Sequence, residues 1–380
     1  MSLSRDLLLA NARLVLADEM LSGTLKATDG RIVAIETGTT AVPSAEDLEG
    51  DLLLPGLVEL HTDNLERHLL PRPGVHWPAF PALLAHDAQA VSAGMTTVFD
   101  ALCVGHGSRR DWQQVLEEAV PVLHQAAEGG HLRAQHHLHL RCELIDPALP
   151  DLFERHGGDP LVRLVSAMDH TPGQRQFADV EQYRKFMRGL GLSESDLDQS
   201  IDRGRDLQER FADPHRRLLA ERCRALGIPM ASHDDETEAH VAEAAALGAR
   251  LSEFPTTGTA AAAARRHGLK SVLGAPNVVR GGSHTGNVSA LELARRGLLD
   301  ILSSDYVPSS LLQACFRLKD EAGITLPGAI ATVTRTPAAA VGLTDRGELC
   351  IGKRADLVRV AETSAGPVVR AVWREGVRVF

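Results

Sequence analysis

Apolar and polar residues follow two different rhythms along the middle of this 380-residue chain. Short runs rich in Val, Leu, Ile and Met are typical of buried strands. The segments between them repeat apolar residues every three to four positions, as amphipathic helices do. The strands are predicted at residues 57–61, 95–99, 136–143, 161–168, 229–233, 250–254, 271–275 and 300–305. Helical segments such as DPHRRLLAERCRALG and VSALELARRGLL separate most of them.

This order predicts an α/β fold with a parallel sheet, because each strand is followed by a helix that returns the chain to the same edge. About eight such units predict a closed (β/α)8 barrel of the TIM type, whose active site lies at the carboxyl ends of the strands. An open, doubly wound sheet is the alternative. It would favour a glycine-rich phosphate-binding turn after the first strand, and the sequence has none there.

Both ends of the chain carry a pattern of short strands instead. The runs LLLANARLVL and RIVAIE lie on either side of an Asp29-Gly30 turn, and ADLVRV and VVRAVWREGVRVF lie near the C-terminus. We expect the two ends to build one structure together. The predicted division is a small β-domain from residues 1–53 and 346–380, beside a barrel from residues 54–345.

The amino-acid composition argues against several classes of function. The net charge of −10 gives no broad basic face for nucleic acid. No apolar run reaches the ~18–20 residues that a membrane span needs. The five cysteines are scattered and form no CxxC pair, which favours a reducing, cytoplasmic setting over a disulfide framework or a cysteine-type zinc site. We therefore expect a cytoplasmic protein whose partner is a small molecule.

Histidines and carboxylates gather where the predicted strands end. His61 and Asp63 follow the first strand two residues apart, so both point to one face. The later strands add Glu143, His233, Glu253 and Asp305. Strand ends converge in a barrel, so five of these residues predict a site for one or two divalent ions: His61, Asp63, Glu143, His233 and Asp305. Imidazole and carboxylate ligands suit Zn²⁺ first, with Fe²⁺ or Mn²⁺ as alternatives.

Any single histidine or aspartate near a strand end also has a structural explanation. A single histidine at a strand end is commonly a hydrogen-bonding residue of the core, and an aspartate there commonly caps the next helix. Asp100, Asp234 and Asp235 have this alternative, and His137 and His139 lie well inside the third strand. The metal prediction depends on several such residues converging.

The motifs LLLPGLVELHTD and GELCIGKRADLV, with the carboxylate, histidine and aspartate of the third, fifth and eighth strands, resemble the amidohydrolase superfamily over nearly the whole chain. The resemblance implies a metal-bearing (β/α)8 barrel beside a small β-domain made by both chain ends. Two positions depart from the common pattern. Asp63 replaces the second histidine of a His-x-His motif, and Glu253 replaces a histidine of the sixth strand. The resemblance therefore implies Glu253 as a further metal ligand.

These departures, with HTDNLERH, MDHTPGQRQF and APNVVRGGSHTGNVSA, resemble a phosphoryl-cleaving branch of that superfamily. This likeness implies metal-dependent hydrolysis of a phosphorylated ribose, α-D-ribose 1-methylphosphonate 5-triphosphate. The products would be the 5-phosphate and diphosphate, in phosphonate breakdown by the carbon–phosphorus lyase pathway. Cleavage of a C–N bond in an amide or cyclic amide is the alternative reaction. A barrel that binds a ligand without turnover would be expected to lose the metal residues.

Such a reaction needs a proton acceptor and cations for the phosphates. We predict Asp305 as the general base, with His170 as a second proton-transfer residue. A guanidinium suits phosphate through its paired donors, although a solvated surface charge is the alternative for every arginine. The predicted substrate-binding residues are Arg67, Arg72, Asn277, Arg280 and His284. The charged insertion at 174–226 is either a lid or a subunit contact, so a homo-oligomer stays open.

Overall fold

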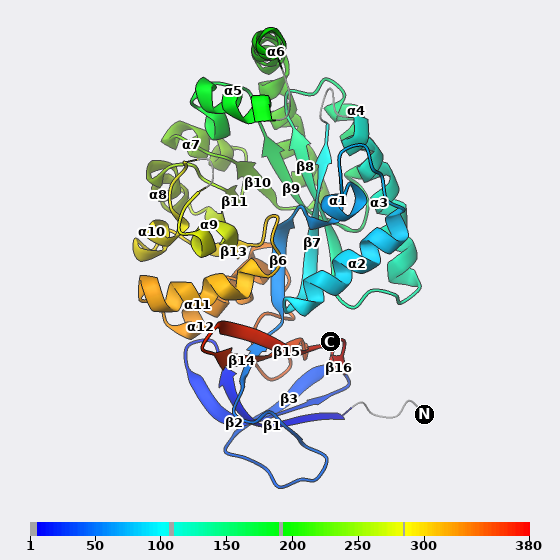
Figure 1. Cartoon of the computed structure of the whole chain (residues 1–380), viewed down its shortest axis with the longest axis vertical. Coiled ribbons are helices and arrows are strands. Elements are labelled where there is room, and N and C mark those ends of the chain that lie inside the picture. Colours follow the sequence, from blue (N-terminus) through cyan, green and yellow to red (C-terminus); the bar gives the residue numbers. More distant parts are fainter. Residues whose placement is uncertain (1–5, 106–109, 190–192, 284–285) are drawn as a thin grey trace. The chain divides into compact units, whose positions relative to one another are not determined.

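The computed structural model describes residues 6–105, 110–189, 193–283 and 286–380 (Figure 1). The chain divides into two compact units. The first, here the terminal unit, contains residues 1–100, 122–136 and 301–380, and the second, the central unit, contains residues 101–121 and 137–300. Among the described residues, no helix combines the length and the apolar character needed to cross a membrane.

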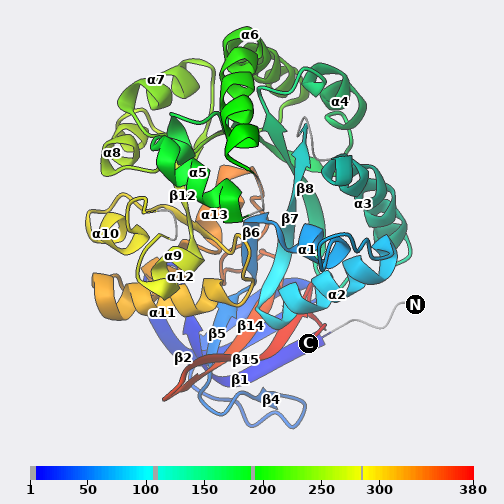
Figure 2. The ribbon, with the colours of Figure 1, turned by 45° about the horizontal axis from the view of Figure 1, so that its top comes forward.

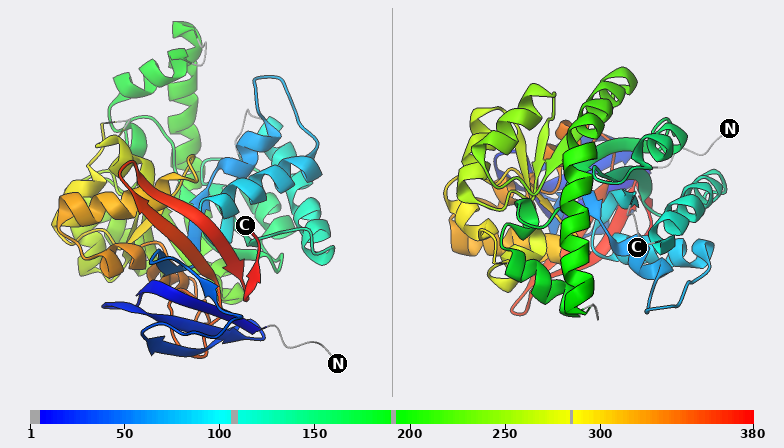
Figure 3. Two further views of the ribbon diagram at one scale, coloured as in Figure 1. Left: turned by 60° about the horizontal axis from the view of Figure 1, so that its bottom comes forward. Right: turned by 90° about the horizontal axis from the view of Figure 1, so that it is seen from above.

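One eight-stranded sheet of the terminal unit joins the two chain ends, in the order β16-β15-β14-β5-β1-β2-β3, with β4 also paired to β1. Its strands are β1 (Asp6–Val15), β2 (Met20–Thr28), β3 (Arg31–Thr37), β4 (Glu46–Asp47), β5 (Leu52–Pro55), β14 (Leu357–Thr363), β15 (Gly366–Arg374) and β16 (Val377–Arg378). Figure 3 shows the C-terminal hairpin in red beside the N-terminal strands in blue.

The expected turn at Asp29-Gly30 is present. Both residues have positive φ, 49° and 79°, which a glycine adopts easily and an aspartate tolerates. Side chains from both chain ends fill the interior of this sheet structure, including the fully buried Leu14, Leu53 and Trp373. One core therefore contains residues from both termini. The exact limits of 1–53 and 346–380 stay a prediction.

The second sheet is the barrel. Its eight strands are β6 (Leu57–Thr62), β7 (Met95–Val104), β8 (Gln135–Glu143), β9 (Val162–Met168), β10 (Met230–His233), β11 (Leu251–Glu253), β12 (Lys270–Gly274) and β13 (Ile301–Ser303). They are ordered as in the sequence, and pairs such as β8–β9 and β10–β11 are parallel. A parallel bridge between Thr62 and Asp305 joins the first strand to the segment after the last one. The predicted (β/α)8 barrel is confirmed.

Helices separate the barrel strands (Figure 2). They are α1 (Asn64–Leu69), α2 (Ala79–Ser92), α3 (Arg110–Glu128), α4 (Leu149–His156), α5 (Val180–Gly189), α6 (Glu194–Leu226), α7 (Glu238–Ala246), α8 (Gly258–Arg266), α9 (Ala275–Arg280) and α10 (Ala290–Arg295), with a 3-10 turn at Arg175–Phe177. Three more helices follow the last barrel strand: α11 (Ser310–Ala322), α12 (Leu326–Ala331) and α13 (Arg335–Ala340). Threonine side chains cap several starts, as Thr237 and Thr257 do for α7 and α8.

The charged insertion forms α5 and the 33-residue α6. A capping box at Ser193 begins α6, since its hydroxyl and the Asp196 carboxylate each pair with the other residue's backbone N–H. Phe177, Tyr183 and Ile201 pack in a small apolar cluster that joins the insertion to the preceding turn. A role as lid or subunit contact stays a prediction.

One strand boundary differs from the expectation in a way that affects the site. We predicted that the second barrel strand ends before Asp100, but β7 continues to Val104 and all ten of its residues are buried. Asp100 therefore lies inside a strand and caps no helix. The strand can pass through a buried carboxylate because two histidines, His86 and His136, bind its oxygens at 2.7 and 2.8 Å.

Candidate metal centre and its surroundings

In the terminal unit, the end of β6 brings three predicted site residues together. The Nε2 atom of His61 lies 3.3 Å from the Oδ1 atom of Asp63, although Asp63 lies just beyond the end of β6. His61, Asp63 and Asp305 each offer a ligand atom within 4.8 Å of the others. Asp63 occupies the N-cap position of α1 but makes no side-chain capping bond. Its carboxylate is therefore directed to His61 and not to the helix.

Backbone hydrogen bonds fix the spacing of these three residues. The Asp305 N–H donates to the carbonyl of His61 at 3.0 Å, and the Asp63 N–H donates to the carbonyl of Asp305 at 2.9 Å. Asp305 has a φ of 54°, in the left-handed region that a non-glycine residue adopts at a cost of roughly 1 kcal/mol or more. Such strain is common at functional sites, and here it turns the Asp305 backbone toward β6.

In the central unit, the end of β10 forms a second group. The Oδ2 atom of Asp234 lies 3.4 Å from His233 Nε2 and 3.8 Å from His170 Nε2. This oxygen is buried and makes no hydrogen bond with the described residues. The Asp234 oxygen and the Nε2 atom of His233 are a carboxylate–imidazole donor pair that suits Zn²⁺ or a similar divalent ion. Asp234 also has a positive φ, 52°.

Glu143 and His170 meet at the ends of β8 and β9. The Nδ1 atom of His170 is 2.6 Å from Glu143 Oε2, and its backbone N–H donates to Oε1 at 3.3 Å. Burial alone would lower the pKa of His170, but the Glu143 carboxylate beside it raises the pKa above its ordinary value. His170 is therefore well placed to hold a proton.

Glu253 is predicted as a metal ligand, but its geometry also fits a residue that orients the ligand His233. Its Oε2 atom accepts from His233 Nδ1 and from the Ser166 hydroxyl, both at 2.7 Å. When Nδ1 of His233 donates to Glu253, Nε2 carries the lone pair that can bind a metal, and carboxylates behind a ligand histidine commonly act in this way. Whether Glu253 ligates directly stays a prediction.

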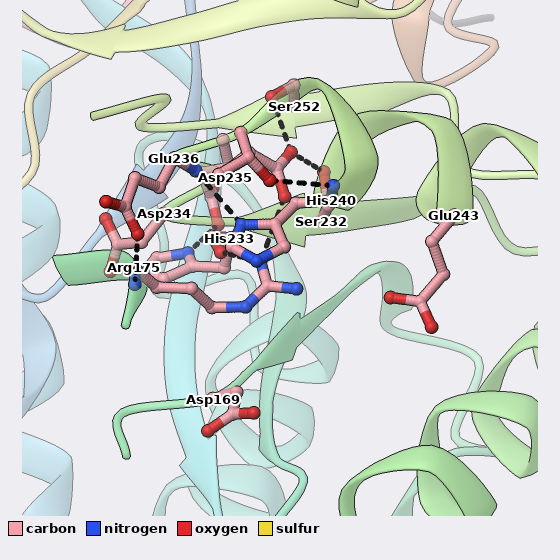
Figure 4. A network of polar contacts seen from close by, with 12 residues as sticks. Asp169, Arg175, Ser232, His233, Asp234, Asp235, Glu236, His240, Glu243 and Ser252 are labelled. Atoms are coloured by element: carbon pink, nitrogen blue, oxygen red, sulfur yellow. Dashed lines mark hydrogen bonds and ion pairs between the residues drawn. The ribbon is translucent and has the colours of Figure 1, made fainter. Parts of the chain in front are cut away.

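A buried arginine, Arg175, supports the end of β10. The Nη1 atom of Arg175 donates to the carbonyl of His233 at 3.0 Å and to Asp235 at 2.9 Å (Figure 4). Asp235 also accepts from the hydroxyls of Ser232 and Ser252. The capping alternative for Asp234 and Asp235 is wrong, because Thr237 caps the following helix.

The predicted phosphate-binding residues are spread over both units. Arg67 and Arg72 are exposed in the terminal unit, where Arg67 donates to the carbonyl of Tyr306 at 2.6 Å. Arg280 is exposed at the end of α9 in the central unit. Asn277 uses its side chain within the loop, bonding to Val288 and Ala290. His284 lies outside the described residues.

Another buried group in the terminal unit contains His86, Asp100, His136 and Asp87. His136 binds Asp100 through Nδ1 and Asp87 through Nε2, at 2.8 and 3.3 Å. The Asn64 amide lies 2.9 Å from Nδ1 of His86 and links this group to α1. Because each ring nitrogen of His136 already faces a carboxylate, the arrangement suits a buried imidazolium better than a metal ligand.

Comparisons with known proteins agree with this architecture. A model of the amidohydrolase family matches residues 161–380. The chain is 47% identical over 378 residues to α-D-ribose 1-methylphosphonate 5-triphosphate diphosphatase of Escherichia coli (strain K12), covering 98% of this chain and 100% of that protein.

Two solved structures share the fold at 17% identity. One is 5-methylcytosine deaminase from Klebsiella pneumoniae liganded with phosphonocytosine, with a TM-score of 0.66 over 98% of both chains. The other is N-acetyl-D-glucosamine-6-phosphate deacetylase from Mycobacterium smegmatis, with a TM-score of 0.65 over 98% of this chain and 100% of that one. Barrel, terminal sheet, family match and full-length relative lead to one conclusion: this chain belongs to the amidohydrolase family.

Proposed function

We propose that this protein is a metal-dependent hydrolase that cleaves α-D-ribose 1-methylphosphonate 5-triphosphate into the 5-phosphate and diphosphate. The observation that carries the proposal is the 47% identity to the E. coli diphosphatase over essentially the full length of both chains. The site supports it through its carboxylate-rich composition, since Asp63 and Glu253 stand where the wider superfamily has histidines.

Divalent ions, one or two in number with Zn²⁺ as the first candidate, are proposed at the two groups described above. His61 and Asp63 are the ligands in the terminal unit. His233 and Glu143 are ligands in the central unit. There the Asp234 oxygen that makes no hydrogen bond adds a further donor, and Glu253 either ligates or orients His233. Such an ion supplies Lewis acidity and lowers the pKa of water toward neutrality.

The chain's own residues provide the proton transfer and the binding of charge. The water oxygen forms a bond to the α-phosphorus, the bond from that phosphorus to the bridging oxygen breaks, and diphosphate leaves with the electron pair. Asp305 accepts the proton of the water. His170, whose pKa is raised beside Glu143, is the second proton-transfer residue. Arg67, Arg72, Arg280, His284 and Asn277 are the proposed contacts of the triphosphate.

The experiment is a product assay that separates the two candidate reactions. The purified protein, loaded with Zn²⁺, Fe²⁺ or Mn²⁺ in turn, is incubated with the ribose triphosphate and followed by phosphorus NMR. We expect one diphosphate for each 5-phosphate formed and no orthophosphate. A parallel panel of amides and cyclic amides tests C–N cleavage. Amide turnover without diphosphate release would overturn the proposal.

The setting we propose is cytoplasmic, with a phosphorylated ribose as the partner. All five cysteines are free, and four are buried, which suits a reducing compartment. The partner proposal follows from the substrate named for the E. coli relative.

A further inference from the structure

Glu59 is a fully buried carboxylate that lies two residues before His61 on β6. Its Oε1 atom accepts the backbone N–H of His61 at 2.7 Å, and its Oε2 atom accepts the backbone N–H of Ser304 at 2.6 Å. A buried carboxylate is costly unless hydrogen-bond donors satisfy its oxygens, and these two backbone N–H groups do so.

The pairing of β6 with β7 explains why His61 needs this acceptor. Glu59 lies opposite Val98 and Thr62 lies opposite Asp100, so three steps along β6 match two steps along β7. One residue of β6 is therefore extra at the place where His61 lies. Such a bulge disrupts the ladder locally and re-aims a side chain, and bulges are common beside active sites. The Glu59 carboxylate accepts the N–H that the bulge turns out of the ladder.

The Oε2 atom of Glu59 binds the segment after β13, which pairs with β6 and closes the barrel. Ser304 directly precedes Asp305, whose own N–H donates to the carbonyl of His61. The Ser303 hydroxyl donates to the same carbonyl at 2.9 Å. One carboxylate thus connects the residue that we propose as a metal ligand with the residue before the proposed base. No neutral side chain of similar size offers two acceptor oxygens in this geometry.

We propose that Glu59 is a positioning residue of the metal centre: its carboxylate holds the β6 bulge and thereby sets the direction of His61 and its spacing from Asp305. The inference rests on the proposed function, because it assigns His61 and Asp305 their roles. Glu59 itself touches neither metal nor substrate in this account. Its effect passes through the backbone of its two partners.

The test uses Glu59→Gln in the full-length protein. A glutamine keeps the size but offers one oxygen and one NH2 group, so it accepts one N–H and opposes the other. We expect at least an ~10-fold weaker affinity for Zn²⁺, measured by chelator competition, as is typical when a residue supporting a ligand is lost. The kcat for diphosphate release should fall more than KM changes, because Asp305 is displaced while the phosphate contacts stay.

Asp356→Asn is the matched control. Asp356 is a buried carboxylate that also accepts a backbone N–H, from Glu375 at 2.8 Å, but it lies in the terminal sheet structure beside Arg354. This variant should lower thermal stability and leave Zn²⁺ affinity within about twofold of the unmodified protein. If Glu59→Gln does not fold, Glu59→Asp replaces it, since the shorter carboxylate reaches only one of the two donors.

The outcomes separate this inference from the proposed function. Zn²⁺ affinity that is equal in the folded Glu59 variant and in the unmodified protein overturns the positioning role, whatever the substrate. Weakened Zn²⁺ affinity with no diphosphate release by the unmodified protein supports the positioning role and rejects the proposed reaction. A stability loss without any change in affinity or in kcat assigns Glu59 a purely structural role and also overturns the inference.

Discussion

Asp234 has a buried carboxylate oxygen without a hydrogen bond, between His233 and His170. If a divalent ion completes this group, the charge of Asp234 is needed to hold it. We predict that Asp234→Asn lowers Zn²⁺ affinity by about 10-fold or more, in line with the loss of a carboxylate near a metal. Calorimetric titration of the metal-free protein with Zn²⁺ measures the effect.

Glu238→Gln provides the control for that measurement. Glu238 is an exposed acid four residues farther along, paired with Arg266 at 2.9 Å on the surface of α7. Its substitution removes the same charge from the same segment without touching the buried group. Equal affinities in both variants would show that Asp234 makes no contribution as a ligand.

Asp305 has a different predicted role from the ligands beside it. Its backbone is tied to β6 on both sides, so Asp305→Asn should keep the local structure while removing the proton acceptor. We expect diphosphate release to fall by about 10²- to 10⁴-fold, the usual effect of losing a general base. Bound metal, measured by elemental analysis, should stay near that of the unmodified protein. A large loss of metal would reassign Asp305 as a ligand.

The sequence made some of these residues easier to predict than others. Asp63 follows His61 by two residues, so spacing marked it as a site candidate, whereas Glu253 became a candidate through the resemblance to the amidohydrolase superfamily. Asp234 also follows a strand and precedes a helix, where an N-cap is the simplest interpretation. Two structural features exclude Asp234 as the N-cap: its left-handed backbone conformation and the capping bond of Thr237. Neither feature can be predicted from the pattern of residue types.

At the scale of elements, buried charge links α2 to β7 and to the first part of β8. Burial alone would lower the pKa of His136, but Asp100 and Asp87 on its two ring nitrogens raise that pKa to about 9. The imidazolium is therefore a stabilising group in the folded state. Since an unfolded histidine has a pKa of about 6.5, this stabilisation is complete below that pH and is lost as pH rises through 9.

We predict that the free energy of unfolding declines between pH 6.5 and 9, by an amount on the order of 3 kcal/mol from this group. Urea denaturation at half-unit pH steps measures the decline. His136→Gln should be less stable at neutral pH and should lose most of the alkaline decline. His267→Gln, which changes an exposed histidine, should keep it. An unchanged pH dependence in His136→Gln would rule out His136 as the titrating group.

The contacts of Asp100 with His86 and His136 also show why the end of one strand could not be predicted from the sequence. Alternation of strand and helix patterns was sufficient to predict all eight barrel strands and the joining of both chain ends, because periodicity records which face is buried. It placed the end of β7 too early, since a charged residue usually marks the end of a buried strand. Asp100 continues the strand because His86 and His136 neutralise it, and both partners come from other elements.

At the scale of the whole molecule, fold and chemistry carry different information. A deaminase and a deacetylase share this architecture at 17% identity, so the barrel alone selects no reaction. The full-length relative at 47% identity and the carboxylates at positions 63 and 253 narrow the proposal to phosphoryl chemistry. The proposed site residues come from most of the length of the chain, from β6 to the segment after β13.

Metal binding should therefore stabilise the folded chain as a whole. An ion that binds only the folded state adds about 4 kcal/mol when its free concentration is ~1,000 times Kd. For a protein of this size that corresponds to several degrees in Tm, roughly 5 °C or more. We predict a fall of this size when a chelator removes the metal, recorded by scanning calorimetry and reversed by Zn²⁺. His61→Ala and His233→Ala should start with less bound metal and respond less to chelator. A full chelator response and unchanged metal content in either variant would remove that histidine from the ligand set.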